Sequence, residues 1–354
     1  MEKTAYLILE NGVVFQGKSF GAIGEITGEI VFTTGMTGYL ETLTDPSYYG
    51  QIILQTFPLI GNYGVIPDDF ECSKISAKAY IVKTPCRNPS NFRSSANLDD
   101  FLRKSGVIGL YGIDTRMLAK IIRKNGVMNG KITRNKPTES DLSEAKKYDI
   151  KNAVSAVSGS AAGKIGGFRR VALMDFGAKQ GIADALFERD CDVRVFRHNA
   201  SVSEIMNFKP GGVMLSNGPG DPANPDNKKI VATIRTLMQS GIPIFGICLG
   251  HQLLAIANGY ETQKLKFGHR GTNQPVKETA TGRVFISSQN HGYSVIAKNS
   301  SFVNVNDGTC EGLDYGNSFS VQFHPEACGG PLDTGFLFDR FMERIDDFSA
   351  KNVA

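Results

Sequence analysis

Residues 242–252 read IPIFGICLGHQ, an apolar strand that runs directly into a cysteine with a glycine two residues away on each side. An ordinary buried cysteine behaves as a small hydrophobe and needs no special backbone around it. Glycines on both sides let a turn tighten without Cβ clashes, and Gly-x-Cys-x-Gly between a strand and a helical run has the form of a nucleophile elbow. The stretch therefore predicts a strand end that presents the thiol of Cys248.

The sequence around this stretch alternates strand-like and helical segments. The strand-like segments are RVALMDF, DVRVF, GGVMLS and IPIFGI, and the helical runs between them end near 189, 207 and 239. Such alternation predicts right-handed βαβ crossovers and a mostly parallel α/β sheet covered by helices on both faces. Ligands bind beyond the carboxyl ends of the strands in sheets of this kind. Cys248 and the motif SNGPGD at 216–221 both follow strands and are expected at that edge.

The first part of the chain has a different pattern. YLILENGVVF at 6–15 places Asn-Gly between two β-prone runs, which predicts a hairpin because a type I′ turn needs positive φ at both central residues. DTRMLAKIIRKNG at 114–126 predicts a helix that Asp114 caps and Gly126 ends. This part is therefore expected to be α+β.

A length of 354 residues predicts two domains. SGSAAGKIGG at 158–167 contains four glycines and is typical of a flexible crossing. We therefore expect an α+β N-terminal domain at 1–150, a linker at 151–168 and an α/β domain at 169–354.

Composition limits the classes of partner. Lys and Arg total 39 against 35 for Asp and Glu, without a long run of like charge, so no nucleic acid is expected. The apolar runs are far shorter than the roughly 20 residues that span a bilayer, so no membrane is expected. The first residues lack a signal-peptide pattern. The six cysteines form no CxxC pair, which favours reduced thiols, no metal site and a cytoplasmic location.

A cysteine nucleophile needs a base, and the base needs an orienting group. Among the five histidines, His324 lies in SFSVQFHPEA just after a strand, with Glu326 two residues on. In an extended backbone these two side chains project to the same side, so the carboxylate can hold one tautomer of the imidazole. The sequence thus predicts a triad of Cys248, His324 and Glu326. Taken alone, each motif also fits a buried structural cysteine or a surface turn.

The glycines of SNGPGD expose backbone N–H groups at a strand end. Gly218 and Gly220 suit an anionic or oxyanionic ligand, and the N–H of Leu249, which follows the cysteine, is a second donor. A plain Pro-Gly turn is the alternative for this motif alone.

Together, GICLGHQ, SNGPGD and HPE resemble, in this order, the class I (triad-type) glutamine amidotransferase family. Three further motifs narrow the resemblance to a smaller group within this family: DFGAK at 175–179, KFGHRGTNQPV at 266–276 and SQNHGYSV at 288–295. FTTGMTGYLETLTDPSYYGQI at 32–52 and GIDTR at 112–116 extend it to the N-terminal part. The whole chain resembles the small, glutamine-hydrolysing subunits of carbamoyl-phosphate synthases.

The resemblance implies a role for each motif. Cys248 attacks the side-chain amide of glutamine, His324 transfers protons, Glu326 orients His324, and a γ-glutamyl thioester forms. Gly220 and Leu249 donate to the oxyanion. The residues that the resemblance assigns to glutamine binding are Ser47, Gly218, Gly220, Leu249, Gln252, Asn290, Gly292 and Tyr293. The sequence departs from the family pattern at Gly35, Tyr293 and Phe323. None of these departures removes a functional group from the triad.

The resemblance also implies a partner. No ATP-grasp pattern, P-loop or metal site is recognisable, so we expect no cofactor in this chain, with ATP and Mg²⁺ on a large subunit that uses the ammonia, with bicarbonate, to make carbamoyl phosphate. We expect a heterodimer, or a higher assembly of it, that docks largely through the N-terminal domain and serves arginine synthesis, pyrimidine synthesis or both. The alternatives are an elbow-type cysteine hydrolase and a catalytically silent regulatory binding module.

Overall fold

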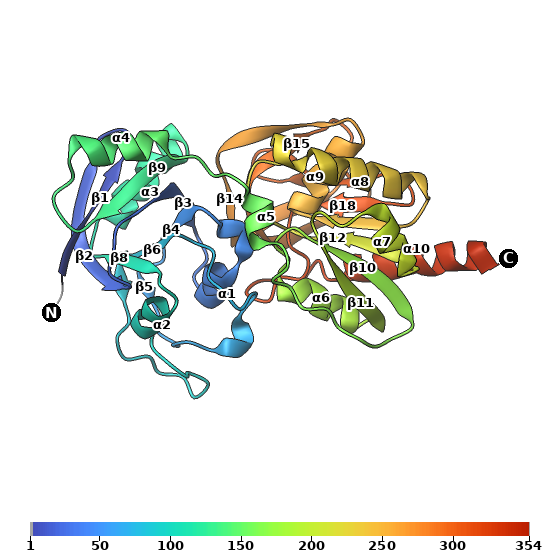
Figure 1. Cartoon of the computed structure of the whole chain (residues 1–354), viewed down its shortest axis with the longest axis horizontal. Coiled ribbons are helices and arrows are strands. Elements are labelled where there is room, and N and C mark those ends of the chain that lie inside the picture. Colours follow the sequence, from blue (N-terminus) through green and yellow to red (C-terminus); the bar gives the residue numbers. More distant parts are fainter. Residues whose placement is uncertain (1–2, 354) are drawn as a thin grey trace. The chain divides into compact units, whose positions relative to one another are not determined.

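The structure is a computed structural model that describes the backbone of residues 3–353 and the side chains of residues 3–351. The chain forms two compact units that divide between Lys151 and Asn152. Figure 1 shows the strands and helices of both units. Each unit has its own buried core, so each is described by itself.

The first unit is built on a closed barrel of mixed strands in the order β1-β2-β8-β6-β4-β3-β9, with β9 pairing back to β1. The strands are β1 (Lys3–Leu9), β2 (Val14–Gly21), β3 (Ile26–Thr33), β4 (Gln51–Gln55), β6 (Ala79–Val82), β8 (Ile108–Tyr111) and β9 (Met128–Thr133), and β5 (Leu59–Ile60) pairs separately with β7 (Thr84–Pro85). The helices are α1 (Tyr39–Thr44), η1 (Pro46–Tyr48), η2 (Pro67–Asp69), α2 (Leu98–Lys104), α3 (Thr115–Asn125) and α4 (Glu139–Lys147).

Two local predictions for this unit are confirmed. β1 and β2 form the predicted antiparallel hairpin, but its turn is not the type I′ turn expected: Gly12 has φ 86°, whereas Asn11 does not have positive φ. Helix α3 begins after Asp114, whose carboxylate accepts the N–H of Met117, and it ends at Gly126 with φ 99°. Barrel closure was not predicted, because the pairing of β9 with β1 and β3 joins segments far apart in the sequence.

The second unit contains a sheet in the order β11-β10-β12-β13-β18-β17-β16-β14-β15. Its parallel half consists of β10 (Arg169–Asp175), β11 (Cys191–Arg197), β12 (Gly212–Leu215), β13 (Ile244–Ile247) and β18 (Phe319–Val321). The antiparallel half consists of β14 (Glu261–Glu278), β15 (Val284–Ile296), β16 (Phe302–Asn304) and β17 (Cys310–Asp314). Four of the parallel strands, β10 to β13, are those that the βαβ alternation predicts, whereas β18 and the antiparallel half extend the sheet beyond that pattern.

Helices cover the parallel half on both faces, as expected. One apolar cluster joins the sheet to α6 (Gln180–Phe187) and α10 (Phe336–Val353). The other cluster joins it to α7 (Val202–Asn207), α8 (Lys228–Gln239) and α9 (Leu249–Ala257). Helices α8 and α9 pack side by side, and η3 (Pro225–Asn227) leads into α8 (Figure 1). The strand ends are therefore held between two packed helical layers.

The range 151–168, expected as a linker, contains ordered structure that belongs to the second unit. Helix α5 (Ala153–Val157) buries Val154 and Val157, which are three residues apart and so share one face of the helix. Lys164 then forms a β-bridge with Val193 of β11. Hydrogen bonds from Ser158 Oγ and the Gly159 N–H to Asp175 also hold this segment, despite its glycines.

Among residues 3–353, no helix has the length and apolar character needed to cross a membrane. The six cysteines are free thiols.

Candidate active site

Cys248 lies on the sharp turn between β13 and α9. Its backbone has φ 53° and ψ −103°, a conformation that a non-glycine residue rarely adopts and that costs on the order of 1–3 kcal/mol. A Cβ on Gly250 would lie 2.3 Å from the carbonyl oxygen of Leu215, and one on Gly246 would lie 2.7 Å from that of Gly250. The two glycines are therefore needed for close backbone packing, and the predicted elbow is present.

The surroundings of Cys248 fix its position. The residue is buried, and its backbone N–H donates to the carbonyl of Val321 at 2.9 Å. Its Sγ contacts the carbonyl oxygen of Asn290, on β15, at 3.7 Å. As the N-cap of α9, Cys248 lies at the positive end of the helix dipole, which favours a thiolate.

Neighbouring strands bring the histidine to the same edge of the sheet. β13 and β18 pair in parallel, with Ile247 opposite Val321, so Cys248 and His324 both follow the carboxyl ends of adjacent strands. β15 contacts both residues, because the N–H of His324 donates to the carbonyl of Ser288 at 2.9 Å. Cys248 and His324 thus each contact a backbone carbonyl within 288–290.

His324 and Glu326 make the contact that their spacing predicts. His324 Nδ1 lies 2.6 Å from Glu326 Oε1, and both side chains are buried. A carboxylate only accepts hydrogen bonds, so Nδ1 donates and Nε2 is left as the acceptor. Within the described residues this Nε2 is buried without a hydrogen-bond partner. The imidazole is therefore held in the tautomer that a general base requires.

Lys179 is a further group at this site that sequence reasoning missed. Its Nζ lies 4.0 Å from Glu326 Oε1, and its backbone N–H donates to the Asn217 side chain at 3.0 Å. Burial alone would raise the pKa of Glu326, but its interactions with His324 and Lys179 outweigh burial and lower it. The carboxylate is therefore kept ionised. The available signal was the position of Lys179 just after a strand whose carboxyl end lies at this edge.

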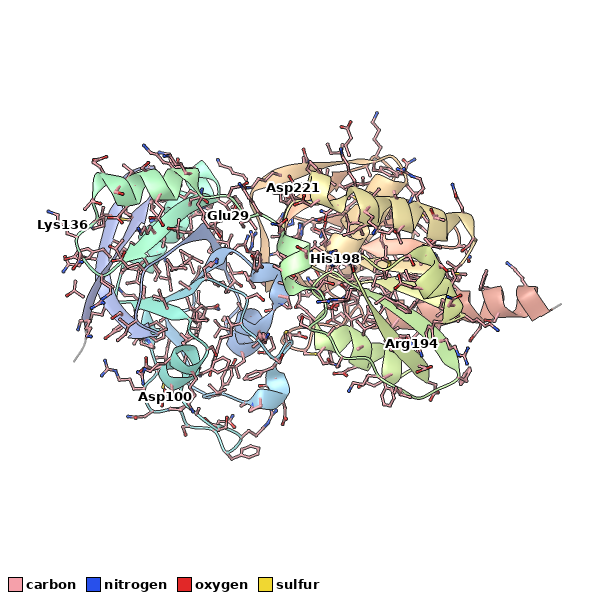
Figure 2. All side chains as sticks on the ribbon, viewed as in Figure 1. Glu29, Asp100, Lys136, Arg194, His198 and Asp221 are labelled. Atoms are coloured by element: carbon pink, nitrogen blue, oxygen red, sulfur yellow. The ribbon has the colours of Figure 1, made fainter. Side chains whose placement is uncertain are left out.

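The SNGPGD loop follows β12 and packs on the residues after β10. Ser216 Oγ accepts the N–H of Phe176 at 2.9 Å. A Cβ on Gly218 would lie 2.3 Å from the carbonyl oxygen of Phe176, so glycine is required there. Gly220 has φ 94°, which also favours glycine. Asp221, labelled in Figure 2, accepts the N–H of Ala223 and so supports the turn that follows. Oxyanion donation by this loop and by Leu249 stays a prediction.

Several residues predicted to bind glutamine lie together in the second unit. Gln252, on α9, donates from Nε2 to the Tyr293 carbonyl and to Gln322 Oε1, each at 2.9 Å. Asn290 and Gly292 lie on the same strand as Tyr293, and the Asn290 carbonyl contacts Cys248. Ser47 lies in the first unit, on η1, where its N–H donates to Asp45 Oδ1. Its contribution to glutamine binding stays a prediction.

The remaining histidines have other environments. His251 is buried, and burial lowers its pKa to about 3, with Nδ1 at 2.8 Å from Ser320 Oγ. His198, labelled in Figure 2, follows β11, and its backbone N–H donates to Ser158 Oγ. His251 belongs to the GICLGHQ motif, but neither histidine is assigned a chemical role.

His269, His291 and Glu311 bring three possible metal ligands within 4.8 Å of one another. The side-chain amide of Asn304 lies between two of them, because its Nδ2 is 3.1 Å from Glu311 Oε1 and 3.4 Å from His269 Nδ1. Two of the three side chains therefore already have a hydrogen-bond partner in Asn304. We interpret the group as a hydrogen-bond network, which the sequence did not reveal because its members lie on different strands.

Comparisons with known proteins agree with the two-unit architecture. The family model for the carbamoyl-phosphate synthase small chain, CPSase domain, matches residues 7–132, and that for class-I glutamine amidotransferases matches residues 172–344. The chain is 49% identical over 347 residues to a carbamoyl phosphate synthase small chain of Clostridium perfringens, covering 96% of this chain and 99% of that one. It is 47% identical over 350 residues to a carbamoyl phosphate synthase pyrimidine-specific small chain of Bacillus subtilis, covering 96% and 95%.

Proposed function

Because the chain belongs to the small-chain family of carbamoyl-phosphate synthases and carries a class I glutamine amidotransferase domain, we propose that Cys248 hydrolyses glutamine to supply ammonia for carbamoyl phosphate. One observation carries this proposal: a strained cysteine elbow shares a sheet edge with a buried His324–Glu326 pair joined at 2.6 Å. A thiol, an oriented base and a carboxylate are the groups that acyl transfer from an amide needs.

The first half of the reaction forms the acyl-enzyme. His324 Nε2 accepts the proton of Cys248, and the thiolate attacks the amide carbon of the glutamine side chain. The oxyanion of the tetrahedral intermediate accepts hydrogen bonds from the N–H groups of Gly220 and Leu249, each worth about 10²- to 10³-fold in rate. The carbon–nitrogen bond then breaks as His324 returns the proton to nitrogen. Ammonia leaves, and the γ-glutamyl thioester remains on Cys248.

The second half consumes water. His324 removes a proton from the water as it attacks the thioester carbon, and the carbon–sulfur bond breaks to release glutamate and restore the thiol. Glu326 stays ionised throughout and stabilises the imidazolium that forms twice in the cycle. Gln252, Asn290, Gly292 and Tyr293 are proposed to hold the substrate, together with Ser47 and the SNGPGD glycines.

The ammonia requires a partner. We propose that a large chain uses ATP, Mg²⁺ and bicarbonate to convert it to carbamoyl phosphate, since this chain is similar to proteins named as small chains. Protected transfer between the chains avoids protonation of ammonia, which would be mostly ammonium at neutral pH. The name of the Bacillus subtilis relative favours pyrimidine synthesis, with arginine synthesis as a further outlet. Free thiols favour a cytoplasmic location.

The thioester is the most specific feature of this proposal, and it can be trapped. Acid quenching during turnover of labelled glutamine, followed by peptide mapping, should place the label on the peptide that contains Cys248. Label on another residue, or none during steady turnover, would refute the proposed intermediate. Turnover of peptides or esters without glutamine hydrolysis would instead favour an elbow-type cysteine hydrolase.

A further inference from the structure

A partly buried polar array lies on the strands next to the candidate glutamine pocket. We call it the Glu311 array, and it consists of Glu311 on β17, His269 on β14, Asn304 on β16 and Asp307 in the loop between β16 and β17. Glu311 is fully buried. No step of the proposed mechanism uses these residues, so their presence needs another explanation.

The contacts within the Glu311 array are continuous. His269 Nε2 lies 2.8 Å from Asp307 Oδ2, and its Nδ1 lies 3.5 Å from Glu311 Oε1. Asn304 donates to the same Glu311 oxygen at 3.1 Å. Thr309 fixes the Asp307 carboxylate through its hydroxyl and its backbone N–H. The imidazole of His269 therefore lies between the carboxylates of Asp307 and Glu311 and contacts both.

Charge reinforces this geometry. Burial lowers the pKa of His269, but the carboxylates of Glu311 and Asp307 outweigh burial and raise it. Burial raises the pKa of Glu311, and His269 and Asn304 oppose that rise. A buried carboxylate is costly, and apolar residues of similar volume would fill the same space at lower cost. A role in simple packing therefore explains the array poorly.

His291 connects the Glu311 array to the residues of the candidate glutamine pocket. In the antiparallel register of β14 and β15, His269 lies opposite His291, and their rings meet edge to face with centroids 5.0 Å apart. His291 Nδ1 is 2.8 Å from the carbonyl of Tyr293. The same carbonyl oxygen accepts a hydrogen bond from Gln252 Nε2. The imidazole of His291 therefore fixes a backbone group that orients the Gln252 amide.

The backbone of Glu311 reaches the same amide by a second route. Its carbonyl accepts the N–H of Gln322 at 2.9 Å. The Gln322 side chain in turn accepts Gln252 Nε2 at 2.9 Å. Glu311 is thus connected to Gln252 by two chains of contacts. One passes through His269 and the β15 residues His291 and Tyr293, and the other passes through Gln322, two residues before His324.

We propose that Glu311, His269 and Asp307 are positioning residues that hold His291, the Tyr293 carbonyl and Gln252 in the arrangement that binds glutamine. The inference rests on the proposed glutaminase function and adds a set of residues that never touch the reacting atoms. It predicts that damage to the Glu311 array weakens glutamine binding and spares the chemistry at Cys248.

The experiment uses the full-length chain with its large-chain partner and compares Glu311→Gln and Asp307→Asn with the unaltered protein. Asp307 is exposed, so its variant covers the case in which Glu311→Gln fails to fold. Two quantities are measured: kcat and KM for glutamine hydrolysis, and saturable inactivation by the glutamine analogue 6-diazo-5-oxo-L-norleucine. Glu278→Gln is the matched control, because this buried carboxylate lies on β14 and pairs with Arg340 instead.

Loss of a charged hydrogen bond in the array should raise KM, and the analogue concentration for half-maximal inactivation, about tenfold. The values of kcat and the maximal inactivation rate should stay within about twofold, and Glu278→Gln should match the unaltered protein. Unchanged KM in both folded array variants, or a loss confined to kcat, would overturn the inference. Activity lost on chelation and restored by Zn²⁺ would overturn it too, by making the array a metal centre. Failure of the unaltered protein to release glutamate would instead refute the proposed function.

Discussion

Three single residues carry the proposed chemistry, and the structure gives each a physical reason for its place. Cys248 adopts a backbone conformation that residues with a side chain rarely adopt. One ring nitrogen of His324 is hydrogen-bonded to Glu326. The Glu326 carboxylate is kept ionised although it is buried. Strain and burial both oppose folding. They persist because the surrounding sheet and helices hold these groups in position.

The strain at Cys248 predicts a difference between two inactive variants. Cys248→Gly removes the side chain from a conformation with φ 53°, whereas Cys248→Ala keeps a Cβ there. We expect the glycine variant to have an unfolding free energy about 1 kcal/mol higher than the alanine variant, although glycine normally destabilises. Urea unfolding of both proteins measures the difference. An alanine variant as stable as the glycine variant would show that the turn is unstrained.

The His324–Glu326 contact predicts a large effect of Glu326→Gln. An amide can donate to His324 Nδ1, which places the ring proton on Nε2 and removes the acceptor for the thiol proton. Glutamate release should fall by about 10²- to 10⁴-fold while the fold is retained. Steady-state assays of this variant beside Glu278→Gln measure the effect. A fall of less than about tenfold would argue against an orienting role.

The buried His251 predicts a pH dependence of stability. Its pKa falls from 6.5 to about 3 in the folded protein, so the unfolded chain binds the extra proton between these values. The unfolding free energy therefore falls as pH decreases below 6.5, by up to about 1.4 kcal/mol per pH unit from this group. His251→Gln should flatten the slope between pH 6.5 and 5 in urea titrations. His198→Gln, at a partly buried ring, should flatten it less, and equal slopes for all three proteins would contradict the account.

At the scale of elements, local patterns predicted much of the site. The alternation of strands and helices places β10, β12 and β13 in a parallel sheet, so their carboxyl ends meet at one edge. The predicted elbow and the His324–Glu326 contact follow from local geometry. Lys179 could have been found by the same argument, because it follows β10 at that edge.

Other features could not be read from local patterns. The Glu311 array draws on β14, β16 and β17, whose order in the sheet differs from their order in the sequence. The closure of the barrel by β9 is of the same kind. Both depend on pairing between distant segments, which residue periodicity does not encode.

The junction of β13 and α9 predicts a steric effect of Gly250→Ala. The new Cβ would lie 2.3 Å from the backbone oxygen of Leu215, so α9 and Cys248 must shift. We expect the unfolding free energy to fall by about 1–3 kcal/mol, together with loss of glutaminase activity. Gly241→Ala is the control, because open space surrounds it and only its φ of 74° is unfavourable. Full activity in a folded Gly250→Ala variant would contradict the required close packing.

At the scale of the whole molecule, two units with separate cores divide the chain between Lys151 and Asn152. The second unit holds the complete triad and the residues around Gln252. Docking of a large chain by the first unit stays a prediction. The matches to small chains extend over both units, so the activity is expected to depend on a partner.

The most direct test of the central claim is glutamate release from glutamine by the purified chain, alone and with an ATP- and bicarbonate-using large chain, beside Cys248→Ser. The account predicts weak release by the chain alone, stimulation by the partner, and loss of release in the variant under both conditions. No release by the unaltered protein in either condition, or undiminished release by Cys248→Ser, would contradict the assignment of Cys248 as the nucleophile of a glutaminase.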